Sequence, residues 1–212
     1  MSFAPSLLGR ELGCIRGDTP IFRGVNFQIL QGESLQVKGA NGVGKSSLLR
    51  LIAGLLPVSS GKLQWQEPAA FSQRCLLINH KQGLKTHLTV VEMMRYWSGL
   101  QPGSSQDIGE ILAVCDLTDL AEFPTALLSQ GQRQRLNLCR LQIFSAWLWL
   151  LDEPFSGLDT DGQKILCSLI QAHQQQGGSV IFVSHQSFAS SKIWQPNQHL
   201  DLTLPSLLRE VA

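Results

Sequence analysis

The sequence contains few charged residues and no long hydrophobic run. Charged side chains make up 16% of its 212 residues, and the formal net charge is +1. This balance argues against a nucleic-acid partner and against an acidic solvating tail. Its longest apolar stretch, residues 146–151, is far shorter than the ~18 residues of a membrane-spanning helix. Residues 1–8 do not resemble a signal peptide. If the chain serves a membrane process, we expect another chain to cross the lipid.

Cysteine and histidine patterns that would indicate disulfides or zinc are also missing. The cysteine number is odd, the spacings are wide, and no C-x-x-C is present, which favours free thiols in a reducing compartment. Four of the histidines show no metal-binding spacing, and we assign them no metal. The residues concerned are Cys14, Cys75, Cys115, Cys139 and Cys167, with His80, His87, His173 and His199.

What is present is a phosphate-binding loop pattern, G-A-N-G-V-G-K-S, at residues 39–46. Glycines allow the backbone to turn tightly around a polyphosphate, and successive N–H groups form a concave anion site. Lys45 supplies a positive charge for the outer phosphates, and the Ser46 hydroxyl is a ligand for Mg²⁺. The predicted nucleotide-binding residues here are Gly39, Ala40, Asn41, Gly42, Val43, Gly44, Lys45, Ser46 and Ser47.

The segments that flank this loop are those that the pattern requires. Residues 33–38 place Leu35 and Val37 on alternate positions, as a strand does. Residues 47–56 carry apolar side chains at helical spacing, so the loop opens a helix whose positive end faces the phosphates.

The rest of the chain predicts an α/β fold with a helical insertion. Residues 7–31 read as two strands joined by a turn, and 62–66 and 75–78 as short strands. Helices are expected at 89–99, 106–117, 132–144 and 163–175, and a helix or loop at 117–127. Two short runs are apolar throughout, as is typical of strands buried on both faces, at residues 147–151 and 180–183. A possible last strand lies at residues 199–204.

Asp152 and Glu153 follow one of these buried strands, where doubly wound sheets bind ligands. Asp152 is predicted to hold Mg²⁺, and Glu153 to orient and deprotonate the attacking water. The alternative is that the two acids merely start a helix, but this is less favourable downstream of a phosphate loop.

Two further sites have weaker local support. Ser129, Gly131 and Gln132 surround a predicted helix start, which makes a second anion-binding surface. An ordinary capping box explains the same residues, and on local grounds it is the better explanation. His185 ends the strand 180–183 and can hydrogen-bond a γ-phosphate, although a lone histidine is more often structural.

Together these motifs resemble the ATPase domains of ABC transporters in order and spacing over nearly the whole chain. The matching segments are residues 39–46, 128–132, 150–154, 156–159 and His185. The resemblance implies a single ABC ATPase domain over residues 1–212, with a P-loop NTPase core, an N-terminal antiparallel β subdomain and a helical signature subdomain at about 88–145. It also implies ATP and Mg²⁺ as cofactors, and a head-to-tail homodimer that forms on ATP binding.

One branch of the family is most similar. Residues 79–85, N-H-K-Q-G-L-K, and 88–90, L-T-V, resemble the ATP-binding subunits of the cytochrome c maturation (haem exporter) branch. This likeness implies a peripheral protein on the cytoplasmic face of the bacterial inner membrane, with integral membrane partners. It also implies that ATP hydrolysis powers the release of a haem-loaded chaperone.

The sequence departs from the family pattern at three places. No aromatic residue stands near positions 14–16 to stack on adenine, and Arg16 is predicted to take that role. Gln82 is the candidate for the glutamine that contacts Mg²⁺, although Lys81 is an alternative by spacing. Gln130 replaces a small residue in the signature, and we expect its side chain to point to solvent.

Other functions remain open at this stage. One is an ATP-hydrolysing subunit of a different small exporter, for a lipid or a peptide. Another is a scaffold that binds ATP and dimerises with little turnover. A soluble factor in DNA repair or translation fits poorly, because such chains usually carry two cassettes and basic surfaces.

Overall fold

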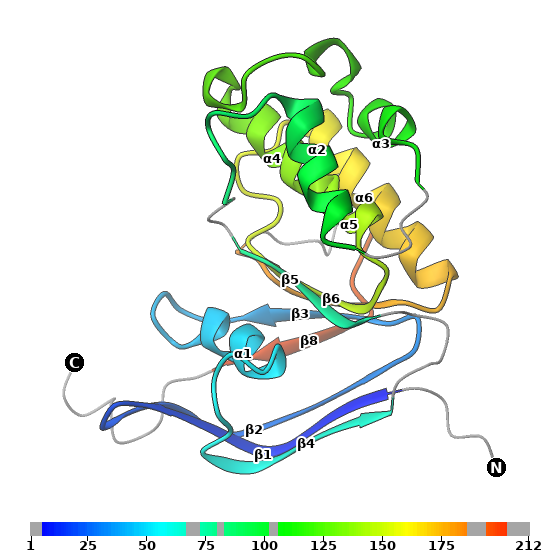
Figure 1. The fold of residues 1–212 in the computed structure, drawn as a ribbon. Helices are drawn as coiled ribbons and strands as arrows, with labels where there is room; N and C mark the ends of the chain where they lie inside the picture. The colour runs from blue at the N-terminus through cyan, green and yellow to red at the C-terminus, as the bar shows by residue number, and fades with distance from the viewer. Residues whose placement is uncertain (1–5, 67–72, 80–82, 102–105, 186–193, 203–212) are drawn as a thin grey trace.

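The computed structural model describes residues 6–66, 73–79, 83–101, 106–185 and 194–202. Two β-sheets lie one above the other with helix α1 (Lys45–Ile52) between them, and most of the other helices cover the far face of the upper sheet (Figure 1). This layered α/β arrangement confirms the predicted fold class.

The lower sheet is antiparallel and is built from the N-terminal part of the chain. It contains β1 (Ser6–Arg16), β2 (Thr19–Leu30) and β4 (Ser60–Gln66), in the order β2-β1-β4. In β2, Val25, Phe27 and Ile29 are buried and alternate with exposed polar residues. The alternation predicted for a half-buried strand is therefore confirmed.

The upper sheet is parallel throughout. Its order is β5-β6-β7-β3-β8. The strands are β3 (Ser34–Lys38), β5 (Gln73–Ile78), β6 (Ala146–Asp152), β7 (Ser179–Val183) and β8 (Gln198–Asp201). Because all five strands run the same way, the segments that follow β3, β6 and β7 meet at one edge. The possible last strand thus exists, but it begins at Gln198 and ends at Asp201.

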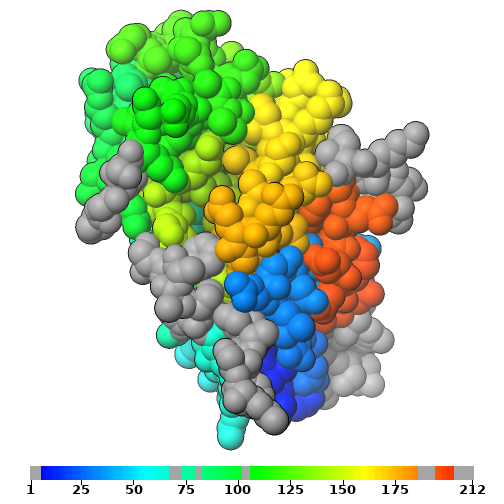
Figure 2. Space-filling view, turned by 90° about the vertical axis from the view of Figure 1, so that its right-hand side faces the viewer, coloured from blue at the N-terminus to red at the C-terminus, as the bar shows by residue number. Residues whose placement is uncertain are grey.

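The chain between β5 and β6 is helical in its described part. It forms α2 (Val90–Gly99), α3 (Ile108–Val114), α4 (Gln130–Leu138) and α5 (Arg140–Ile143). Segment 117–127, for which helix and loop were both open, forms two 3₁₀ turns, η1 (Thr118–Leu120) and η2 (Thr125–Leu127). Figure 2 shows α6 (Thr160–Gln175), in yellow to orange, between these green helices and the blue N-terminal strands.

The predicted bounds of four helices were wrong. The helix expected at 106–117 is the shorter α3, and the one expected at 163–175 begins at Thr160. The helix after the phosphate loop ends at Ile52 rather than 56, because Gly54 follows in a left-handed conformation (φ 75°) and Leu55 is exposed. The helix expected at 132–144 begins at Gln130 and is divided at Cys139 into α4 and α5.

Side chains of β6 reach both hydrophobic cores. Trp147 lies in the core around α1 between the two sheets, whereas Trp149 lies in the core beneath the helices. Every residue of β6 and β7 is buried, which confirms that these strands are covered on both faces. Among the described residues, none of the helices combines the length and hydrophobicity needed to cross a bilayer.

Candidate active site

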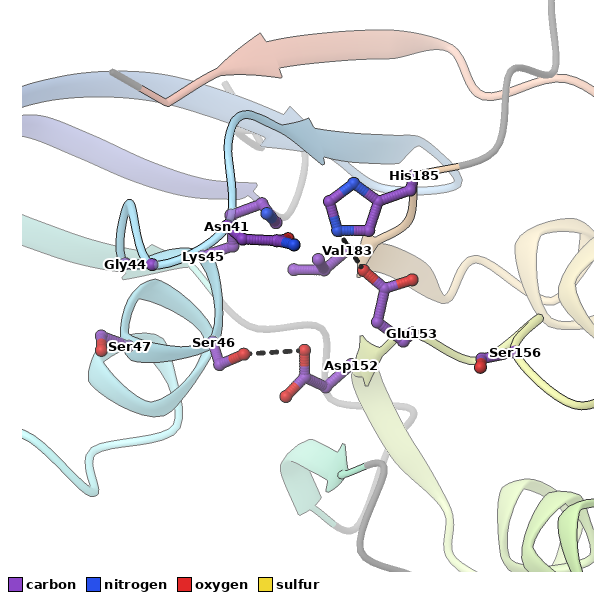
Figure 3. A pocket seen from close by; sticks show the side chains of 11 residues that line it. Asn41, Gly44, Lys45, Ser46, Ser47, Asp152, Glu153, Ser156, Val183 and His185 are labelled. Atoms are coloured by element: carbon purple, nitrogen blue, oxygen red, sulfur yellow. Dashed lines mark hydrogen bonds and ion pairs between the residues drawn. The ribbon is translucent and has the colours of Figure 1, made fainter. Parts of the chain in front are cut away.

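A cleft of about 500 Å³ opens at the carboxyl edge of the parallel sheet. Side chains from the loop after β3 and from the ends of β6 and β7 point into it from opposite sides (Figure 3). Its lining residues are Asn41, Gly42, Gly44, Lys45, Ser46, Ser47, Asp152, Glu153, Ser156, Val183 and His185. The structure therefore brings together most of the residues that were predicted from three separate segments.

Two glycines of the loop are required by close packing. Gly39 has φ 141°, and a Cβ atom there would collide with the backbone oxygen of Leu202. Gly44 has φ 104° and would collide with the Ile21 side chain. Both conformations are strained for residues with a side chain. The loop is consequently held against the strand β2 and the segment after β8.

Lys45 is folded back over the loop. Its side chain is buried, and Nζ donates to the backbone oxygens of Gly39 and Ala40, each at 2.9 Å. Lys45 also begins α1, which has Gly44 as its N-cap and no side-chain cap. The first N–H groups of the helix are thus left to an anion, and the ammonium adds positive charge beside them.

Ser46 and Asp152 place two oxygen atoms that can act as metal ligands side by side. The Ser46 hydroxyl donates to Asp152 Oδ1 at 2.9 Å, and Asp152 is 4% exposed at the end of β6. A hydroxyl and a carboxylate beside a phosphate site are ligands that suit Mg²⁺, which usually takes one or two protein oxygens together with phosphate oxygens and water. The residues present therefore fit this ion.

Glu153 is fixed by its backbone and faces His185. It has φ 51°, and its N–H donates to the Val183 oxygen at 3.1 Å. Its Oε1 lies 3.3 Å from His185 Nε2 (Figure 3). Burial raises the pKa of the Glu153 carboxyl, with the charges of His185 and Lys45 acting in the opposite direction. A raised pKa makes the carboxylate a better proton acceptor.

The second predicted anion site lies apart from the cleft. Ser129 Oγ accepts from the Gln132 N–H at 3.2 Å, and Gln132 Oε1 accepts from the Ser129 N–H at 2.8 Å, so the capping box exists. Ser129, Gly131 and Gln132 line a separate depression of about 390 Å³ that shares no lining residue with the cleft. Within one chain, none of these three residues lines the cleft that contains the phosphate loop.

Sequence reasoning missed a charged contact beside this depression. Arg135 donates from one nitrogen to both carboxylate oxygens of Asp159, at 2.7 and 2.8 Å, and also contacts Asp116. Hydrogen bonding to Arg135 lowers the pKa of Asp159. Asp159 caps α6 through the Gly162 N–H. Arg135 thus joins α4 to the turn before α6.

The remaining predicted residues fall outside the cleft. Arg16 is exposed at the end of β1 and does not line it, so its contact with adenine stays a prediction. Gln82 and Lys81 lie outside the described residues, and the choice between them stays open. Gln130 is exposed at the start of α4, as expected.

This combination of a phosphate loop, an acid pair after a buried strand and a second helix N-terminus is typical of nucleotide-hydrolysing domains of the P-loop class. The ABC transporter family matches residues 22–156, and the chain belongs to this ATP-binding family.

Curated relatives are similar over most of the chain. The cytochrome c biogenesis ATP-binding export protein CcmA of Rhodopseudomonas palustris (strain HaA2) is 39% identical over 182 residues, covering 84% of this chain and 91% of the relative. CcmA of Salmonella typhi is 40% identical over 186 residues, covering 85% and 89%. CcmA of Bradyrhizobium diazoefficiens is 39% identical over 184 residues, covering 85% and 92%.

Solved structures share the fold. The ATP-binding subunit of an ABC transporter superposes with a TM-score of 0.80 at 20% identity, covering 92% of this chain and 85% of the other. An ABC transporter ATP-binding protein of Pyrococcus furiosus gives 0.77 at 20% identity, covering 93% and 97%. At this identity, the likeness concerns the fold.

Proposed function

We propose that this chain is the ATP-hydrolysing subunit of an ABC complex for cytochrome c biogenesis, serving haem export or the release of a haem-loaded chaperone. The main support for ATP hydrolysis is that Lys45, Asp152 and Glu153 line the same cleft. Relatives named for cytochrome c biogenesis, about 40% identical over most of the chain, support the biological role.

Each group of residues in the cleft has a separate role in ATP hydrolysis. The N–H groups of the loop and of α1, with Lys45, bind the phosphates and stabilise the charge that develops on them. Mg²⁺ held by Ser46 and Asp152 would neutralise phosphate charge. Glu153 orients a water molecule and accepts its proton, for which its raised pKa is suited. His185, 3.3 Å from Glu153, contacts the γ-phosphate.

The separate depression at Ser129 supports a dimer. In a two-fold assembly, the α4 N-terminus of one copy faces the phosphate loop of the other, so each nucleotide lies between two chains. The exposed N-terminus of α4 supplies N–H groups for the γ-phosphate of the partner's nucleotide. ATP binding would close this dimer, and hydrolysis would open it and drive integral membrane subunits from the cytoplasmic face of the bacterial inner membrane.

Affinity purification of the tagged chain from solubilised membranes tests the biological role. We expect small integral membrane subunits and a haem-binding periplasmic chaperone to be recovered, with the chaperone lost after ATP is added. The Glu153→Gln variant is the matched control, because it should keep the chaperone bound in ATP. Recovery of subunits that carry lipid or peptide would favour another exporter, and a complex without ATP turnover would favour the scaffold.

A further inference from the structure

Gln36 is a buried amide in the middle of the parallel sheet. It lies in β3 between Leu35 and Val37, and it is fully buried. The register places it opposite Phe182 of β7. A buried amide is unfavourable in such surroundings unless it forms hydrogen bonds, so its contacts indicate why a polar residue stands at this position.

The Gln36 side chain reaches the segment that carries His185. Its Nε2 donates to the backbone oxygen of Ser184 at 3.1 Å. The pairing of β3 with β7 ends at Val37 and Val183, and Ser184 is the next residue. The amide therefore extends the contact between the two strands by one residue, up to the residue before His185.

The end of β7 is consequently held from both neighbouring strands. On the β6 side, the Glu153 N–H donates to the Val183 oxygen at 3.1 Å. On the β3 side, Gln36 holds the Ser184 oxygen. Two consecutive carbonyls are thus fixed directly before His185, whose side chain is 55% exposed and extends into the cleft (Figure 3). The position of its ring depends on this backbone.

We propose that Gln36 is a positioning residue for ATP hydrolysis, which sets His185 relative to Glu153 and to the γ-phosphate. This inference rests on the proposed ATPase function. Because β3 leads directly into the phosphate loop at Gly39, the same strand that presents the loop also holds the histidine segment. Nucleotide binding does not require this contact, whereas the alignment of the catalytic groups does.

The variant Gln36→Met tests the proposal, because methionine has a similar length and lacks the donor. We expect ATP affinity within about twofold of the wild type and a kcat lowered roughly tenfold to a hundredfold, as for a displaced catalytic group. The control is Ser34→Ala, at a buried residue at the other end of β3. It removes the 2.8 Å hydrogen bond that the Ser34 hydroxyl donates to Asn197 Oδ1 and the 3.1 Å bond that it accepts from the Asn197 N–H. It should lower thermal stability and leave kcat unchanged.

A double-mutant cycle with His185→Ala separates positioning from a structural role. If Gln36 acts through His185, then adding Gln36→Met to His185→Ala should lower kcat no further. Full additivity of the two losses, or a wild-type kcat in Gln36→Met, would overturn the proposal. If Gln36→Met and Gln36→Leu both fail to fold while Ser34→Ala folds, the amide serves general stability and the proposal is wrong. Absence of ATP turnover in the wild type would instead refute the proposed function.

Discussion

Ser46 and Asp152 are 106 residues apart in the sequence, and the Ser46 hydroxyl donates a 2.9 Å hydrogen bond to the Asp152 carboxylate. The contact joins the first turn of α1 to the end of β6. It exists because β6 and β3 belong to one parallel sheet, with β7 between them. The chain therefore places two oxygen ligands side by side before any ion is bound, so little reorganisation is needed to hold Mg²⁺.

Replacing Asp152 with asparagine should separate this role from folding. Asparagine keeps the oxygen that accepts from Ser46 but removes the charge. We expect ATP hydrolysis to fall by roughly a hundredfold or more, with a higher Mg²⁺ requirement. Steady-state hydrolysis over a Mg²⁺ titration measures both. Asp161→Asn, at an exposed carboxylate paired with Lys164, should behave as the wild type. An unchanged Mg²⁺ dependence in Asp152→Asn would contradict the assignment.

Replacing Glu153 with glutamine should stop turnover without preventing ATP binding. Loss of a general base lowers rates by roughly 10²–10⁴-fold, so we expect phosphate release to collapse and an ATP-bound dimer to accumulate. Light scattering after size-exclusion chromatography detects that dimer. Burial raises the Glu153 pKa, which means that the folded chain holds the charged carboxylate less favourably than the unfolded chain does. Removing this charge should therefore make the nucleotide-free variant unfold at a higher temperature. Glu122→Gln, at an exposed position, serves as the control.

Much of the cleft could be predicted because its residues lie in short motifs. The phosphate loop is a local feature, and Asp152 and Glu153 follow a run that is apolar throughout. Parallel pairing then brings the ends of β3, β6 and β7 to one edge. The three segments could therefore be placed in one cleft from the sequence, although the register of the paired strands was not known.

The long-range contacts of Gln36 and Arg135 could not be predicted. Gln36 stands in the strand that was recognised only by Leu35 and Val37, and its bond to Ser184 spans 148 residues. Arg135 contacts two carboxylates from different elements. Neither pairing follows from the hydrophobic periodicity of the sequence. Periodicity shows which face of a helix or strand a side chain lies on, but not which distant residue it contacts. Likewise, the division between α4 and α5 at Cys139 could not be predicted, because no glycine or proline stands there to indicate a helix end.

Two variants that are inactive alone should restore activity when mixed, if each nucleotide lies between two chains. Lys45→Ala removes the phosphate contact of its own loop, and Ser129→Arg blocks the site offered to the partner. A mixed dimer contains one site with neither change. At equal concentrations we expect about a quarter of the wild-type rate, because half of the dimers are mixed and each has one active site.

The matched control for this mixture combines two defects that act within the same chain. Lys45→Ala and Glu153→Gln both affect residues of one cleft, so every site of their mixed dimer keeps one defect. Hydrolysis should remain at background in that mixture. Recovery in the control, or none in the first mixture, would contradict a site built from two chains.

His173 should make the stability of the chain depend on pH. It is buried on α6, stacks on Trp149 with ring centroids 3.8 Å apart, and its Nε2 lies 3.0 Å from the Trp147 oxygen. Burial lowers its pKa to about 4. Between pH 7 and pH 5 the unfolded chain gains a proton at this residue while the folded chain does not. Folding is therefore weakened as the pH falls, by about 2 kcal/mol over this range.

Chemical denaturation of the wild type at pH 7 and pH 5 measures this loss. His173→Phe keeps a ring beside Trp149 but cannot titrate, so its free energy of unfolding should fall by about 2 kcal/mol less over the same interval. His87→Gln, at an exposed histidine, should retain the wild-type dependence. Comparing variants cancels the contribution of Glu153, whose raised pKa acts in the opposite direction, since its proton is bound more tightly in the folded chain. An equal pH dependence in wild type and His173→Phe would show that the histidine is not held neutral by burial.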